Sequence, residues 1–499
     1  MVQGQIAKGA IISYIAIFLN IAITFFYTPW MIRQIGMSDY GLYSLVGTFI
    51  SYFIIDFGLS GAITRFITKY RAEGDQQKVE NMLGLTTKVY LCIDAAIFFI
   101  LFICYFFLKN IFTGLTADEV EKLKVLYVIA GTFSVLSFVW HPMNGAMMAY
   151  EYFVENKLMD MFHKVGTVML IVVALLLHGG VYELVFITGA VGFLTSLFKF
   201  IIFKHKSQIH INWRYSERQE MKNLLSFSVW VFLTSMAQRF RLTMMPTILG
   251  ILANSTEISI FALGMTIEAM TYTLSSALNG LFLPKVTRML HSGDNGKQVT
   301  DLMIRVGRLQ LYIIGLIIMG FWLVGREFLH LWVGDNFNNS YYVVLLLTVF
   351  NIVSLTQHIA GDVVYAENKV RYTATLTFVS SALSLLGALI LAKYLGAVGC
   401  AIAFCIAMTL NQVWLNIFYR RTLHLEIGRF FRECHGRILP MLLGVTILAF
   451  AVKHFVAIDN WYSLFAFIVG YTFVYLVVSY TFLFNKEEKA LVPFASINK

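Results

Sequence analysis

The run MLGLTTKVYLCIDAAIFFILFICYFFL, at residues 82–108, decides the fold of this chain. It is almost entirely apolar, and it exceeds the roughly 20 residues that a helix needs to cross a hydrocarbon core about 30 Å thick. Its two charged residues, Lys88 and Asp94, are too few to keep such a segment in water. The run therefore predicts a transmembrane helix.

Comparable runs recur along the whole chain. Of its 499 residues, 58% are hydrophobic and only 13% are charged, about half of the charged fraction of a soluble domain, roughly 25%. The runs predict an all-α polytopic membrane protein with about fourteen transmembrane helices. Their expected ranges are 9–32, 41–64, 82–108, 125–149, 158–178, 181–203, 224–250, 258–282, 301–325, 341–364, 372–392, 396–419, 438–456 and 460–484.

Basic residues between the spans are strongly asymmetric. Lys and Arg are concentrated in alternate segments, most densely at 199–222 and 420–437. Because such residues collect in cytoplasmic loops, both termini are expected in the cytoplasm. The same asymmetry accounts for the net charge of +10, so no nucleic-acid partner is expected.

The chain also contains an internal duplication at an offset of about 217 residues. ITKYRAEGDQQK (67–78) aligns with VTRMLHSGDNGK (286–297), and Lys88 aligns with Arg305. Two six-helix halves that enter the membrane in the same direction form parallel repeats, an arrangement found in transporters. The expected domains are an N-lobe at 1–204, a cytoplasmic linker at 205–223, a C-lobe at 224–420, and two further helices with a tail at 421–499.

Pro29 and Pro246 align across the duplication. Each removes a backbone donor inside the first helix of its lobe. Interrupted helices at matching positions of two repeats point to a transport pathway. We therefore predict hinges at these prolines.

The sequence lacks the common motifs of nucleotide-binding proteins and hydrolases. It has no GxxxxGK[ST], HExxH or GxSxG pattern, and its five cysteines show no CxxC spacing. We expect no catalytic residue, no bound metal and no cofactor, and a transporter rather than an enzyme. Energy would then come from an ion gradient, with H⁺ or Na⁺ as the coupling ion.

Ionisable residues within spans are costly and mark functional candidates. Arg239 and Arg241, near the middle of the seventh span, are expected to line a water-filled cavity and bind substrate. An internal ion pair with Glu268 of the eighth span is the alternative. Asp56, Asp94 and Glu268 are the candidates for ion coupling, with a balancing role for nearby cations as their alternative. Lys88 is a further substrate-binding candidate, or else a lysine that reaches the inner surface.

Two segments carry a resemblance to a known family. IGMSDYGLYSL (35–45) and DFGLSGAITRFITKYRAEGD (56–75) are similar to motifs of the polysaccharide and O-antigen flippases. These proteins form a branch of the multidrug/oligosaccharidyl-lipid/polysaccharide exporter superfamily. The resemblance implies a MATE-like, V-shaped fold of two lobes. It also suggests Arg65, inside the second motif, as a first contact for the substrate headgroup, with anchoring at the cytoplasmic surface as the alternative.

The function implied by the resemblance is movement of a lipid-linked glycan. The expected cargo is an undecaprenyl-pyrophosphate-linked oligosaccharide, carried from the cytoplasmic to the outer leaflet of the bacterial cytoplasmic membrane. Its product would feed O-antigen, capsule or other surface polysaccharide, with a polysaccharide polymerase as a partner. A lipid II flippase and a multidrug/cation antiporter of the same superfamily are the alternatives, and cationic residues at mid-membrane disfavour the antiporter.

Overall fold

The computed structural model describes residues 2–52, 59–275, 282–291, 296–367, 369–485 and 488–489. The side chains at 2–18, 223, 225–235, 237–241, 274–275, 283–284 and 291 lie outside this description. The described residues are helical almost throughout and contain no strand. The predicted all-α fold class is therefore confirmed.

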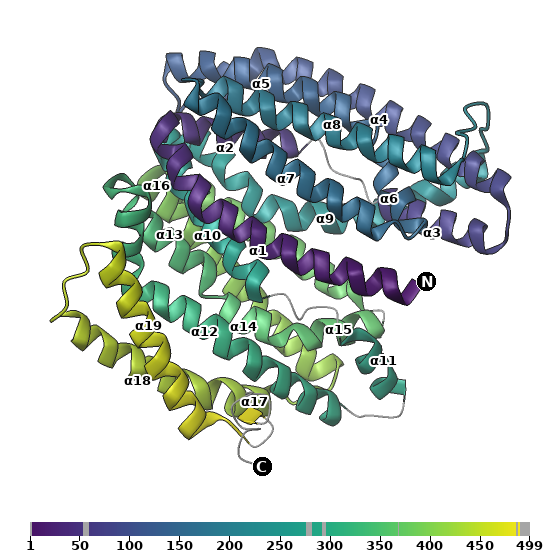
Figure 1. Cartoon of the computed structure of the whole chain (residues 1–499). Coiled ribbons are helices and arrows are strands. Elements are labelled where there is room, and N and C mark those ends of the chain that lie inside the picture. The colour runs from purple at the N-terminus through teal and green to yellow at the C-terminus, as the bar shows by residue number, and fades with distance from the viewer. Residues whose placement is uncertain are drawn as a thin grey trace. The chain divides into compact units, whose positions relative to one another are not determined.

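The chain forms two compact units, which are considered separately. The first comprises Met1–Ala262 and Ala388–Ala397. In it, the long helices α4, α5, α7 and α8 run side by side (Figure 1). Its helices are α1 (Val2–Ile35), α2 (Met37–Ser51), α3 (Leu59–Ala72), α4 (Gln76–Ile111), α5 (Ala117–Phe138), α6 (Pro142–Ala149), α7 (Phe153–Leu176), α8 (Val181–Ser207) and α9 (Arg218–Leu252), followed by the first part of α10 (Ser255–Ser275).

The second unit comprises Leu263–Gly387 and Val398–Lys499. Within it, α18 and α19 both pack against α12 (Figure 1). Its elements are α11 (Leu283–His291), α12 (Lys297–Val333), α13 (Ser340–Thr348), α14 (Asn351–Ser354), α15 (His358–Ala366), most of α16 (Val370–Thr422), α17 (Ile427–Phe430), the π-helical turn η4 (Phe431–His435), α18 (Gly436–Lys453), α19 (Trp461–Val478) and the π-helical turn η5 (Ser479–Leu483).

Each expected span overlaps an observed helix. In the described part of the chain, nine helical stretches are long and apolar enough to cross a membrane. One of them, α16, contains a break at Gly396, whose φ of 53° lies in the left-handed region, and so covers the two predicted spans 372–392 and 396–419. The total of fourteen stays a prediction. The short helices α11 and α17 were not expected.

Two matching spans are interrupted at corresponding positions. The fourth span breaks after α5, and α6 begins at Pro142, where a missing N–H does no harm to a first helical turn. The tenth span breaks at a 3₁₀ turn, Leu355–Gln357, before α15. His141 and His358, which align at an offset of about 217 residues, stand at these two breaks. The duplicated sequences therefore give similar local structure.

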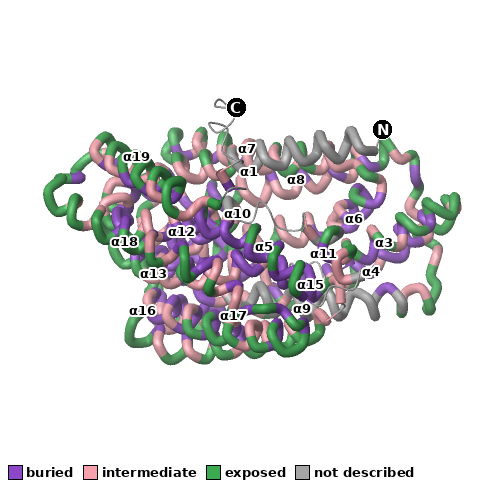
Figure 2. Tube along the Cα trace, turned by 90° about the horizontal axis from the view of Figure 1, so that it is seen from below, coloured by how far each residue is buried: buried purple, intermediate pink, exposed green. Residues whose placement is uncertain are grey.

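Burial is uneven along the helices. Figure 2 shows buried residues concentrated along α12, whereas α18 and α19 carry many exposed ones. The exposed side chains of α18 and α19 are largely apolar, including Leu448 and Phe473, as expected of helices that face lipid. The lobe boundaries predicted from the duplication stay a prediction, since compact units and duplicated segments need not share limits.

Candidate functional site

The segment 35–45 begins α2 and fixes it to α5. Ser38 Oγ donates to Glu119 Oε1 at 2.7 Å, and Lys122 Nζ lies 2.8 Å from Asp39 Oδ1. Both contacts connect the first turn of α2 with the first turns of α5. The polar residues of this motif therefore hold the first unit together.

Gly41 of the same motif allows a close helix approach. A Cβ at this position would lie 2.3 Å from the Ser255 carbonyl oxygen and 2.7 Å from Ser259 Oγ. Only glycine leaves room for the backbone of α10 at this distance. Ser259 Oγ also donates to the Met37 carbonyl oxygen, which strengthens the same contact.

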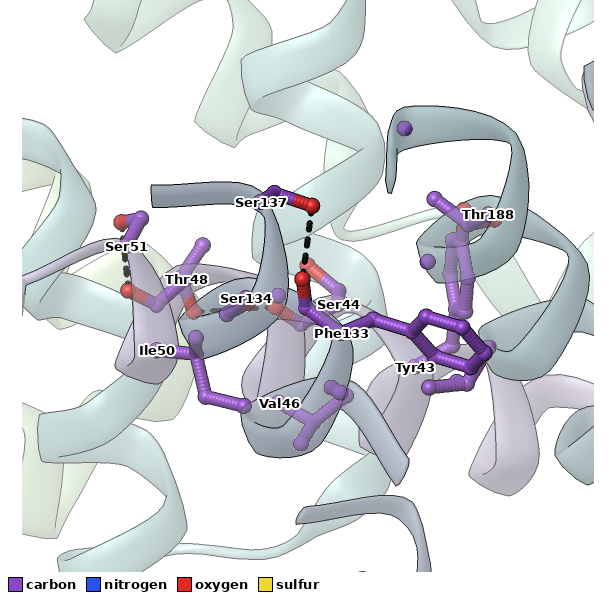
Figure 3. A pocket seen from close by; sticks show the side chains of 15 residues that line it. Tyr43, Ser44, Val46, Thr48, Ile50, Ser51, Phe133, Ser134, Ser137 and Thr188 are labelled. Carbon is purple, nitrogen blue, oxygen red and sulfur yellow. Dashed lines mark hydrogen bonds between the residues drawn. The ribbon is translucent and has the colours of Figure 1, made fainter. Parts of the chain in front are cut away.

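Tyr43, two residues further on, faces a pocket inside the first unit. The pocket has a volume of about 480 Å³ and lies among α2, α5 and α8 (Figure 3). Tyr43 Oη lies 3.5 Å from Thr188 Oγ1 across it. Its lining residues are Tyr43, Ser44, Val46, Gly47, Thr48, Ile50, Ser51, Ala130, Phe133, Ser134, Ser137, Val185, Thr188, Gly189 and Gly192.

The pocket is rich in hydroxyl groups but has no charged lining residue. Thr48, Ser51 and Ser137 each donate their proton to a backbone carbonyl of their own helix, at 2.9, 2.6 and 2.6 Å (Figure 3). Their oxygens therefore face the pocket mainly as hydrogen-bond acceptors. Such a lining suits an uncharged polar group and offers nothing to a pyrophosphate.

Lys88 of α4 contacts the segment expected to link the lobes. Its Nζ donates to the Tyr215 carbonyl oxygen at 3.0 Å. One turn earlier, a Cβ on Gly84 would lie 1.9 Å from the Asn212 carbonyl oxygen, so the linker rests directly on the α4 backbone. Lys88 is half-buried in this contact. Its predicted substrate contact is untested.

Asp94 lies on α4 six residues beyond Lys88, about 9 Å along the helix axis and on a different face. Its side chain is 6% exposed, and its Oδ1 has no hydrogen-bond partner among the described residues. An ion or proton would satisfy this oxygen, because a buried polar atom without a partner is costly. Asp94 stays a candidate for ion coupling.

Glu268 lies in the second unit, on α10. It is 8% exposed, and its Oε1 accepts a hydrogen bond from Asn351 Nδ2 at 3.2 Å. Asn351 opens α14, one turn before the break in the tenth span. The carboxylate is therefore placed beside irregular backbone, a setting in which transporters hold coupling ions.

Among the remaining candidates, the structure describes the side chain of Arg65 but not those of the other three. Arg65 is an exposed residue of α3, next to Thr64, whose Oγ1 donates to the Gly145 carbonyl oxygen at 3.0 Å. Arg239 and Arg241 lie on the backbone of α9, but their side chains are outside the described residues. Asp56 is also outside them. These assignments stay predictions.

Both predicted hinge prolines lie inside continuous helices, Pro29 in α1 and Pro246 in α9. Beside Pro246, Tyr52 Oη lies 2.8 Å from Thr247 Oγ1 and donates to the Thr243 carbonyl oxygen. An outside donor thus reaches the backbone of α9 near the proline, where regular helix bonding is weakened. Hinge motion at either proline stays a prediction.

The candidates whose side chains the structure describes do not form one cluster within either unit. The first unit holds Lys88 and Asp94 on different faces of α4 and Arg65 on α3, and the second holds Glu268. Sequence reasoning missed the pocket beside Tyr43. Its only signal was the run of hydroxyl residues from Tyr43 to Ser51 in the second span, which ordinary helix packing would also explain.

Taken together, the many long apolar helices define a polytopic α-helical membrane protein. A family model described as "Polysaccharide biosynthesis protein" matches residues 6–290, and the chain belongs to this family.

Two curated relatives resemble most of the chain. The "Uncharacterized membrane protein EpsK" of Bacillus subtilis is 21% identical over 96% of this chain and 95% of its own. The "Probable low-salt glycan biosynthesis flippase Agl15" of Haloferax volcanii is 20% identical over 82% of each chain.

Solved structures support the same fold. The lipid II flippase MurJ in an inward closed conformation aligns with a TM-score of 0.70 at 12% identity, over 96% of this chain and 97% of its own. A multidrug resistance MATE transporter of the MOP superfamily, in an inward-facing conformation, aligns with a TM-score of 0.63 at 14% identity. The alignment covers 83% of this chain and 99% of that transporter. The predicted MATE-like fold is confirmed.

Proposed function

We propose that the chain is a flippase for an undecaprenyl-pyrophosphate-linked oligosaccharide. It would move this lipid from the cytoplasmic to the outer leaflet of the bacterial cytoplasmic membrane, with both of its own termini in the cytoplasm. The observation that carries the proposal is the match of a polysaccharide biosynthesis family to residues 6–290 of a chain that shares the fold of a lipid II flippase over 96% of its length. The product would pass to a polysaccharide polymerase.

Binding of the lipid headgroup is assigned to cations. A pyrophosphate favours arginine, whose guanidinium donates two parallel hydrogen bonds to phosphate oxygens. Arg239 and Arg241 are the main candidates, with Arg65 and Lys88 as contacts nearer the cytoplasm. We expect Arg239→Ala and Arg241→Ala each to abolish transport without preventing membrane insertion. Normal transport by both variants would contradict this assignment.

Binding of the polyprenyl tail is assigned to the second unit. A groove of about 890 Å³ lies between α18 and α19 and is referred to here as the α18–α19 groove. Its lining is almost entirely apolar, which suits an isoprenoid chain. The lining residues are Met441, Gly444, Val445, Leu448, Ala449, Val452, Val456, Ser463, Ala466, Phe467, Gly470, Tyr471, Val474 and Val478.

Coupling to H⁺ or Na⁺ is assigned to buried carboxylates. Asp94 and Glu268 are 6% and 8% exposed, and Asp56 is the third candidate from the sequence. Neutral replacements Asp94→Asn and Glu268→Gln test this role because they keep the side-chain size. If both variants respond to an imposed ion gradient as the wild type does, these residues do not couple transport.

The decisive experiment depletes the protein in its native cell and measures polyprenyl-linked lipids by mass spectrometry. We expect one undecaprenyl-pyrophosphate oligosaccharide to accumulate, and purified protein in vesicles to expose that lipid on the opposite leaflet. Accumulation of lipid II instead would indicate a lipid II flippase. An unchanged lipid profile with greater sensitivity to cationic drugs would indicate a multidrug antiporter.

A further inference from the structure

Arg308 of α12 holds a buried carboxylate from the C-terminal segment. Arg308 and Glu488 are each 4% exposed. The arginine Nε donates to Glu488 Oε1 at 2.6 Å, and its Nη2 lies 2.9 Å from Oε2. This two-point contact uses the planar fork of the guanidinium, which a lysine cannot reproduce.

The same guanidinium contacts the backbone next to both α18 and α19. Its Nη1 donates to the Glu433 carbonyl oxygen at 3.1 Å, in the turn η4 that leads into α18. Its Nη2 lies 2.8 Å from the carbonyl oxygen of Leu483, the last residue of the turn η5 that continues α19. One side chain therefore fixes the adjacent ends of α18 and α19 to the same point on α12.

Tyr312, one turn further along α12, reinforces this point. Arg308 Nη2 lies 2.9 Å from Tyr312 Oη, and the Tyr312 ring packs on Phe484 at 4.9 Å between centroids. Tyr475 of α19 donates from its Oη to the Tyr312 carbonyl oxygen at 3.0 Å. The contacts of Arg308 and Tyr312 thus hold α18 and α19 to α12 beside the end of the α18–α19 groove that Met441 and Val478 line.

The other end of the groove is held differently. There, Lys453 Nζ of α18 lies 2.8 Å from Glu327 Oε1 of α12. Glu327 is nineteen residues beyond Arg308, or about 28 Å along α12, close to the thickness of the hydrocarbon core. At this end α19 meets α12 through the rings of Trp461 and Phe328, whose centroids are 6.3 Å apart. At the Arg308 end, by contrast, a single guanidinium contacts the segments of both α18 and α19.

The duplicated helix α4 lacks the residues that make this attachment. At the offset of about 217 residues that aligns Lys88 with Arg305, Leu91 stands where Arg308 does and Phe98 where Gly315 does. Leu91 and Phe98 are 38% and 51% exposed. A Cβ on Gly315 would lie 2.6 Å from Leu442 Cδ2, so glycine admits α18 at this point. The differences between α4 and α12 thus occur where α12 contacts α18 and α19.

We propose that Arg308 is a positioning residue that sets the separation of α18 and α19 at its end of the groove, and thereby selects the lipid tails that the groove holds. This inference rests on the proposed function, because it takes the groove to be the site of the tail. Glu488 orients Arg308 and balances its charge, and the two carbonyl contacts transmit its position to the helices.

The separation of the helices is tested first, without any transport assay. Spin labels on Met441→Cys and Val478→Cys report the Arg308 end, and labels on Val452→Cys and Ser463→Cys report the far end, in a protein whose five native cysteines are replaced. We expect Glu488→Gln and Arg308→Lys to move the first distance distribution to longer values and to broaden it, leaving the second unchanged. Unchanged distances at the Arg308 end in both variants would overturn the proposal.

Tail selection is tested in vesicles with the same oligosaccharide pyrophosphate on undecaprenyl and on farnesyl tails. We expect the wild-type preference for the long tail to fall about tenfold in Glu488→Gln, a change equal to 1.4 kcal/mol. Lys453→Met, at the far end, is the matched control and should keep the preference. A uniform loss for both tails would overturn tail selection by Arg308. Absence of transport by the wild type would refute the proposed function. The positioning role of Arg308 would then be tested by the spin-label distances alone.

Discussion

The helices α4 and α12 occupy the same place in the duplicated sequence but have opposite environments. In the most apolar stretch of α4, 22% of the residues are buried, against 67% in α12. The exposed face of α4 carries Phe98, Phe102 and Phe106, whereas α12 is covered by α18 and α19. The comparison teaches that α18 and α19 help to cover on α12 a face whose counterpart on α4 stays exposed.

The largest expected effect comes from giving α12 the residue of α4 at the attachment point. Arg308→Leu leaves Glu488 buried without its partner, which costs about 3–5 kcal/mol of stability. Thermal unfolding of the purified protein, followed by size-exclusion fluorescence, measures the loss. The control Arg305→Leu alters an exposed residue of the same helix and should cost less than about 1 kcal/mol. Equal losses in the two variants would contradict a special role of the buried pair.

A smaller effect is expected from filling the space that α12 leaves for α18. Gly315→Phe places a ring where a Cβ alone would lie 2.6 Å from Leu442 Cδ2, and such overpacking costs about 1–3 kcal/mol. The reciprocal change, Phe98→Gly on α4, should cost only about 1 kcal/mol, since it weakens the helix but leaves no buried cavity. The same unfolding assay compares them, and a reversed order would mean that the two environments have been misassigned.

The comparison of α4 with α12 extends to Lys88 and its counterpart Arg305. Lys88→Met removes the hydrogen bond to the Tyr215 carbonyl oxygen, so we expect a loss of about 1 kcal/mol. Arg305→Met should cost less, because Arg305 is exposed. Transport at equal expression separates the two roles of Lys88. A transport loss far larger than the stability loss would favour substrate contact, and proportional losses would favour support of the linker.

The smallest effect is expected on the exposed face of α4. Phe102→Leu exchanges one apolar side chain for another at a position that is 55% exposed, so stability should change by less than about 0.5 kcal/mol. The same exchange in α12, at the partly buried Phe321, is Phe321→Leu, which loses a ring stacked on Tyr341 at 5.8 Å between centroids. If Phe102→Leu destabilised the protein more than Phe321→Leu does, the exposed face of α4 would be an interface and not a lipid-facing surface.

Most of the fold could be predicted from the sequence because the bilayer imposes simple rules. Apolar runs predicted a helix at every expected span, whereas the matching breaks at His141 and His358 were not predicted. Sequence reasoning did not anticipate α11, because a short amphipathic helix lacks the apolar length that marks a span. The break at Gly396 falls at the first residue of the second of two adjacent predicted spans, 372–392 and 396–419.

Less of the site could be predicted, because contacts between distant residues leave no local pattern. Charge within a span singled out Asp94 and Glu268, and both are buried. The same reasoning grouped Lys88 with substrate, whereas its described contact is a linker carbonyl 127 positions away. Arg308 was not singled out at all, since its partner Glu488 is separated from it by 180 positions.

That separation has a consequence for how the protein is made. At a synthesis rate of about 5–20 residues per second, roughly 10 to 35 s pass between the appearance of Arg308 and that of Glu488, which lies 180 positions later. Until then the ninth span carries a cation whose countercharge does not exist. The charge of Arg308 is therefore balanced only when the last helix pair is complete, and a chain that ends before Glu488 keeps this arginine without its carboxylate partner.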